Sequence, residues 1–146
     1  MQRDEPQPVL AAAWLNRARE NLELARLSDI PGTYSLELLA YHAQQAAELA
    51  IKAVYHSLGM EFEWTHDLEI LGKALEDAGV AVSDGVKRAV SLTRYAVRTR
   101  YPGMAPPVTR QEYDEALVLA SAVVKWAAAV MVRENPVPPD ADAGDA

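Results

Sequence analysis

The sequence contains no cysteine. The chain therefore has no disulfide framework, no thiolate metal site and no cysteine nucleophile. It also lacks an uninterrupted apolar run of about 18 residues, the length that a membrane-spanning helix requires, and its first residues contain no apolar signal core. With 146 residues, half of them hydrophobic, the chain is typical of one folded domain. We expect a cytoplasmic protein that does not enter a membrane.

Motifs of catalysis and metal binding are few. The seven glycines are scattered and form no phosphate-binding loop. His42 and His56 are about 21 Å apart along one predicted helix, so they cannot share a metal ion. Glu37, Glu48, His42 and His56 of the predicted second helix lack the Glu-x-x-His spacing of di-iron helical bundles, and no histidine follows His66. We therefore expect neither a metal nor a cofactor.

Proline is absent from the middle of the chain. Because proline breaks helices, residues 32–101, which contain none, are free to form them. Residues 134–146 are rich in Pro, Asp, Ala and Gly and cannot bury enough apolar surface to fold. We predict a flexible N-terminus at residues 1–8, a helical domain at 9–133 and a disordered acidic tail at 134–146.

Apolar residues recur every three or four positions in five segments, which is the spacing of helices that bury one face. These segments are 9–27, 34–58, 68–78, 84–100 and 109–132. Residues that favour helix ends occur at their boundaries: Thr33, Asp67 and Ser83 as N-caps, Gly59 as a stop, and Thr109 with Glu112 as a capping box. No segment alternates with the period of a strand. The predicted fold is all-α, an antiparallel up-and-down four-helix bundle with one short additional helix at 68–78.

The net charge of −7 hides a local excess of positive charge. The stretch 85–111 contains no Asp or Glu and carries six Lys and Arg residues, so the rest of the chain carries −13. Two interpretations remain open at this stage. The stretch is either an ordinary helix surface with Lys and Arg, or an electropositive patch that binds an anion.

The fourth predicted helix carries most of this charge. On an ideal helical wheel, Lys87, Ser91, Arg94, Arg98 and Tyr101 fall within about 80° of one another. Guanidinium groups beside a tyrosine can bind a phosphate and stack a base. The structural alternatives are stabilisation of the helix dipole by cations near its C-terminus and pairing with acidic residues of the second helix.

The second predicted helix offers a polar and aromatic face. Gln45, Glu48 and Lys52 follow one another on it at helical spacing. A Glu48–Lys52 pair at this spacing contributes about 0.3 kcal/mol, too little to explain the cluster. The face is either solvated or contacts a partner or a base edge. His66, just before the third helix, is either a satisfied loop histidine or a catalytic base.

Four segments together resemble the HEPN family, the nucleotide-binding domains of higher eukaryotes and prokaryotes. They are an early helix with Trp14 and Ala18, the second-helix core 44–53 (QQAAELAIKA), the Thr-His-Asp-Leu sequence at 65–68, and the Tyr-Ala-Val-Arg-Thr-Arg-Tyr-Pro-Gly sequence at 95–103 before an alanine-rich final helix. The resemblance covers residues 10–132. It implies an all-α bundle that commonly forms a homodimer and often accompanies a minimal nucleotidyltransferase, in a toxin–antitoxin-like context.

Many members of that family are metal-independent RNases that use an arginine followed four to six residues later by a histidine. This chain lacks such a histidine. We therefore predict a non-catalytic module that binds a nucleotide, RNA or the nucleotidyltransferase partner. Its predicted contacts are Arg94, Arg98, Arg100, Tyr101 and Lys52, with Gln45, Glu48 and His66 in support.

Two alternatives to this module stay open. One is a degenerate RNase toxin that uses His66, or Tyr101 and Arg98, in place of the missing pair. The other is a structural subunit whose arginines only form salt bridges at an interface.

Overall fold

The computed structural model describes residues 5–29, 32, 34–98, 102–103 and 105–134, without the side chains of Asp29 and Arg98. Helices dominate this part of the chain, and it contains no β-strand. In chain order the elements are α1 (Pro8–Ala25), the short 3₁₀ helix η1 (Leu27–Asp29), α2 (Leu36–Leu58), α3 (Leu68–Asp77), α4 (Asp84–Arg88), the 3₁₀ helix η2 (Ala89–Thr93), α5 (Arg94–Arg98) and α6 (Arg110–Glu134). The prediction of an all-α fold is confirmed.

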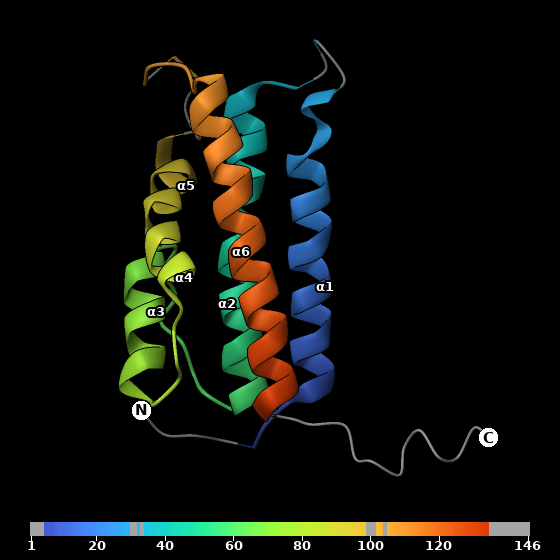
Figure 1. The fold of residues 1–146 in the computed structure, drawn as a ribbon, viewed down its shortest axis with the longest axis vertical. Helices are drawn as coiled ribbons and strands as arrows, with labels where there is room; N and C mark the ends of the chain where they lie inside the picture. The colour runs from blue at the N-terminus through green and yellow to red at the C-terminus, as the bar shows by residue number, and fades with distance from the viewer. Residues whose placement is uncertain (1–4, 30–31, 33, 99–101, 104, 135–146) are drawn as a thin grey trace, which may run out of the picture.

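The long helices alternate in direction (Figure 1). α1 ascends in that view, α2 descends, the α4–η2–α5 segment ascends and α6 descends, while α3 is added beside the α4–η2–α5 segment. This arrangement is the antiparallel up-and-down bundle expected from the sequence, with α3 as the additional short helix.

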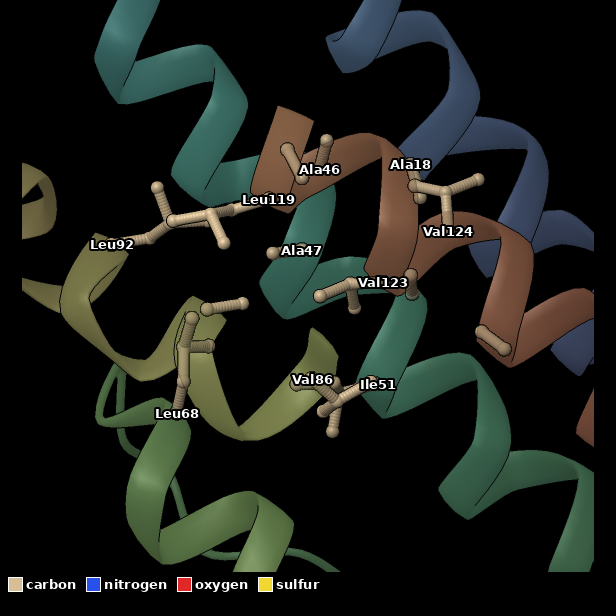
Figure 2. Close-up of a cluster of buried hydrophobic side chains, with 14 of the residues drawn as sticks. Ala18, Ala46, Ala47, Ile51, Leu68, Val86, Leu92, Leu119, Val123 and Val124 are labelled. Carbon is tan, nitrogen blue, oxygen red and sulfur yellow. The ribbon is translucent and has the colours of Figure 1, made fainter. Parts of the chain in front are cut away.

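Small residues bring the central helices together. Ala43, Ala46, Ala47 and Ala50 of α2 have no exposed surface, and Figure 2 shows Ala46 and Ala47 among side chains of the neighbouring helices. An alanine fills little space, so the backbone of a neighbouring helix can approach closely while dense packing is kept. α2 therefore lies at the centre of the bundle and packs against α1 on one side and α6 on another.

Most of the predicted helix ends are confirmed. Asp67 and Ser83 accept hydrogen bonds from the backbone N–H groups of Glu69 and Val86. Gly59 ends α2 with a positive φ of 66°, a conformation that glycine adopts without strain. The capping box at the start of α6 also forms, through the two bonds between Thr109 and Glu112.

The start of α2 and the end of α1 differ from the prediction. Ser35 caps α2 by accepting a bond from the N–H of Leu38, whereas the predicted cap, Thr33, lies outside the described residues. α1 ends at Ala25 rather than near residue 27. The buried Tyr113 hydroxyl of α6 donates to the carbonyl oxygen of Ala25, one of the last carbonyl groups of α1, which have no intrahelical partner.

The prediction of one continuous α-helix over 84–100 is wrong. Residues 89–93 wind as a 3₁₀ helix between α4 and α5. There the Thr93 hydroxyl accepts a bond from the backbone N–H of Leu68 at the start of α3. A 3₁₀ helix has three residues per turn instead of 3.6, so five residues rotate all later side chains by about 100°. The positively charged face predicted on an ideal wheel is therefore divided.

The final helix is long and apolar enough to cross a membrane, as judged by length and composition alone. Its buried side chains, among them Tyr113, Val123 and Trp126, face the other helices. The Trp126 indole N–H donates to the carbonyl oxygen of Ala81 at 3.0 Å. This pattern is that of the core helix of a bundle.

Candidate functional site

A buried carboxylate lies at the middle of α2. Glu48 is 4% exposed and accepts hydrogen bonds from side chains one helical turn away on either side. Gln44 donates its Nε2 to Glu48 Oε1 at 3.0 Å, and Lys52 donates its Nζ to Glu48 Oε2 at 3.0 Å. An ionised carboxylate accepts such bonds at both oxygens, and a buried charge is tolerated only when it is paired in this way.

A third partner comes from outside the helix. His66 Nδ1 lies 2.7 Å from Glu48 Oε1, and the imidazole is half exposed. Because a carboxylate only accepts, Nδ1 carries the proton in this bond, and Nε2 is an acceptor in the neutral form of the ring. The group formed by Gln44, Glu48, Lys52 and His66 is called the Glu48 cluster below.

The Glu48 cluster changes the expectation for Lys52. Its side chain is only 7% exposed, its charge is matched by Glu48, and its Nζ lies 5.1 Å from the centre of the Phe62 ring. An ammonium group held in this way has little surface left for a phosphate. Gln45 is half-buried, and its Oε1 is buried without a hydrogen-bond partner in the described part of the chain.

Arg94 lies at the start of α5 and has a separate set of partners. Its Nη2 donates to the hydroxyl of Tyr95 at 2.8 Å, and its guanidinium carbon lies 4.8 Å from the centre of the same ring. Tyr95 is 1% exposed and therefore fixed by the core. Arg94 also forms a longer ion pair, 3.7 Å, with Glu112 of α6. The tyrosine thus orients a guanidinium whose side chain is 48% exposed.

The remaining predicted contacts cannot be placed. Arg100 and Tyr101 lie outside the described residues, and Arg98 is described only as the last backbone position of α5. Lys87, which the wheel placed on the same face as Arg94, instead pairs with Glu76 of α3 at 3.5 Å. The structure therefore brings Glu48, Lys52 and His66 together and gives Arg94 contacts of its own with α6.

Two residues of the site, Gln44 and Tyr95, are not among the predicted contacts. Gln44 precedes Glu48 at the helical spacing i, i+4, but a glutamine at that position is common on any helix. Tyr95 is adjacent to Arg94 in sequence, and only its burial shows that it holds the guanidinium in place.

Comparison with known proteins agrees with this fold. The HEPN domain model matches residues 11–131. The crystal structure of TT1696 from Thermus thermophilus is 35% identical in sequence and superposes with a TM-score of 0.68, over 82% of this chain and 97% of that one. No curated protein sequence matches the chain.

Proposed function

The chain belongs to the HEPN family, and we propose that within it this protein is a non-catalytic module that binds a nucleotide phosphate. The proposed contact is the segment from Arg94 to Tyr101. We further propose that the module acts as a homodimer beside a minimal nucleotidyltransferase, in a toxin–antitoxin-like pair. The absence of the arginine–histidine RNase motif supports binding rather than cleavage.

The observation that carries this proposal is the position of Arg94. The buried Tyr95 hydroxyl and ring orient its guanidinium, so less conformational entropy is lost when an anion binds. Its ion pair with Glu112 is long and partly exposed, and such pairs contribute about 0–1 kcal/mol. A phosphate, which accepts two parallel bonds from a guanidinium, can displace Glu112 from Arg94 at little cost.

The direct test is a calorimetric titration of the full chain with nucleoside mono- and triphosphates and with a short RNA. We expect Arg94→Ala to weaken phosphate binding by at least about tenfold, since a hydrogen bond to a charged group contributes about 1.5–3 kcal/mol. Arg94→Lys keeps the charge but loses the paired geometry, and we expect intermediate binding.

A matched control is Arg17→Ala on α1. Arg17 carries the same charge as Arg94, is well exposed and pairs with Glu20. It should bind as the parent protein does. Equal losses for Arg17→Ala and Arg94→Ala would show that only net charge matters. Absence of binding by the parent protein would contradict the proposal.

A second candidate function, a degenerate metal-independent RNase, is favoured by the pairing of His66 with Glu48. This pairing fixes the proton on Nδ1, so that Nε2 of the half-exposed ring is a proton acceptor in the neutral form. If the candidate is right, purified protein cleaves RNA in the presence of a chelator, and His66→Gln abolishes the cleavage while nucleotide binding through Arg94 persists. Intact RNA after prolonged incubation would exclude it.

The proposed partner can be tested independently. A minimal nucleotidyltransferase encoded beside this chain, expressed with it, should elute as a joint complex on size exclusion. Separate elution of the two chains would contradict the partnership without bearing on phosphate binding.

A further inference from the structure

An aromatic cluster lies at the end of α2, away from the proposed phosphate contact. Phe62 is at its centre, with ring-centre distances of 5.8 Å to Trp14, 5.6 Å to Tyr55, 5.5 Å to His56 and 5.9 Å to Trp64. Most of these rings are at least partly covered by the fold, but Trp64 is 92% exposed. A fully exposed indole held against a second ring gains little from folding, since most of its apolar surface stays in water.

A cavity of about 570 Å³ opens beside these rings. Its walls are formed by Gln7 before α1, by His56 in the last turn of α2, and by Gly59, Met60, Glu61, Phe62 and Trp64, which follow α2. The backbone N–H of Gln7 donates to the carbonyl oxygen of His56 at 2.9 Å, which holds this N-terminal segment beside the end of α2. The volume is in the range of sites that bind small molecules.

The charge around the cavity is negative. Glu61 lines it, and no lysine or arginine does among the residues that the structure describes. Glu63, on the other side of Phe62 in sequence, is close enough to Tyr55 to help raise the pKa of that phenol to about 12, although burial is the larger cause. Lys52, the cation that lies near the Phe62 ring, is neutralised by Glu48.

His56 adds no opposing positive charge. Burial lowers the pKa of its imidazole below the ordinary value of 6.5, so the ring is neutral at pH 7. Its Nε2 is buried without a hydrogen-bond partner in the described part of the chain. The centre of its ring lies 4.8 Å from that of Trp14. The cavity therefore combines aromatic side chains with the carboxylate of Glu61.

We propose that this cavity binds an organic cation, an alkylammonium or guanidinium group, which lies against the Trp64 ring and is balanced by Glu61. Tryptophan is the side chain that attracts a cation most strongly through its ring face. The same surface disfavours a phosphate, because the Glu61 carboxylate repels it and the described lining residues include no basic side chain to offset that repulsion. This site is thus distinct in chemistry and place from the phosphate contact at Arg94.

Two sources can supply such a cation: a free small molecule, or a lysine or arginine side chain of a peptide. Choline is a suitable probe of the first, because dimethylbutanol has nearly the same shape without the charge. Calorimetric titration of the full chain should show saturable binding of choline and no binding of dimethylbutanol. Equal binding of choline and dimethylbutanol would show that the cavity recognises only apolar shape and would contradict the proposal. The proposal is also overturned if the protein binds neither choline nor a lysine-containing peptide.

Variants locate the binding. Because Trp64 is almost fully exposed, Trp64→Leu should fold normally, which a thermal melt checks, and should weaken choline binding about two- to fivefold. Glu61→Gln should weaken it as well, by removing the balancing charge. Val118→Ala, which changes another exposed apolar residue, on α6, is the control and should bind as the parent does. If neither Trp64→Leu nor Glu61→Gln weakens choline binding, the cation binds elsewhere and the proposed site is refuted.

A short peptide with one central lysine, compared with its glutamine counterpart, tests the second source. Preferred binding of the lysine peptide over choline, with the same dependence on Trp64, identifies a peptide side chain as the ligand. Trp64-dependent binding of adenosine that exceeds that of both cations would instead indicate base stacking and contradict the proposal.

Discussion

The imidazole Nδ1 of His66 lies 2.7 Å from Oε1 of Glu48, although the two residues are 18 positions apart in sequence. After Gly59 the chain turns back along α2, so the segment before α3 covers the middle of that helix. The contact places a half-exposed histidine over a carboxylate that is 5% exposed and already paired with Lys52.

Glu48 should be essential for stability. In Glu48→Gln, Lys52 keeps its charge in a buried position without a carboxylate, and we expect the free energy of unfolding to fall by about 3 kcal/mol. Urea denaturation followed by circular dichroism measures this. The double variant Glu48→Gln with Lys52→Met removes the stranded charge and should recover most of the loss. A single variant as stable as the parent would contradict the burial of the pair.

Gly72 should be replaceable with a gain in stability. It lies in the middle of α3, and a Cβ placed there meets no heavy atom within 4 Å. It borders a cavity of about 470 Å³ between α3 and α4. Since glycine in a helix costs about 1 kcal/mol relative to alanine, Gly72→Ala should raise the free energy of unfolding by about that amount.

Gly59 provides the opposite case in the same measurement. Its φ of 66° lies in the left-handed region, so Gly59→Ala should lower stability by about 1 kcal/mol. If both alanine variants changed stability in the same direction, backbone conformation would not be the cause.

Acid should destabilise the protein through its two partly buried histidines, His42 and His56. Burial lowers the pKa of His56 and of His42 in the folded state, whereas both return to about 6.5 when the chain unfolds. The unfolded chain therefore binds protons first, and the contribution of these rings to stability is present above pH 6.5 and is lost as the pH falls toward their folded pKa. The melting temperature should therefore fall as the pH is lowered from about 7.5 to about 5.5.

The variant that isolates one of these rings is His56→Phe, which keeps an aromatic side chain beside Trp14 and removes the titrating nitrogen. The melting temperature of this variant should depend less steeply on pH over the same range. A slope equal to that of the parent would exclude His56 as a contributor.

Thr93 should support the start of α3. Its hydroxyl accepts a bond from the backbone N–H of Leu68 at 3.1 Å. Thr93→Val has the same shape but leaves that N–H unsatisfied, and we expect a loss of about 1–2 kcal/mol in urea denaturation. Ser91→Ala, which removes only an exposed bond to the carbonyl oxygen of Arg88, should cost less than half as much. Equal costs would indicate that the tertiary bond contributes nothing.

Part of the candidate site could be predicted because it depends on spacing within one helix. Glu48 and Lys52 are four positions apart, so an α-helix places them together wherever that helix lies. Their burial and the approach of His66 could not be predicted, because they depend on the path that the chain takes after Gly59. The hydrogen bond and ring contact between Tyr95 and Arg94 likewise could not be predicted, because they depend on which side of α5 faces the core.

The five helical segments, most of their ends and the acid-free stretch 85–111 can be predicted from the amino-acid sequence, because periodicity, capping and charge are local properties. The distribution of that charge over the surface depends instead on contacts between distant segments. The bond between Thr93 and Leu68 accompanies a 3₁₀ helix in the middle of the fourth segment. The changed winding rotates Arg94, which pairs with Glu112 of α6, away from the direction of Lys87, which pairs with Glu76 of α3. A helical wheel assumes uniform winding, and contacts between distant segments break that assumption here.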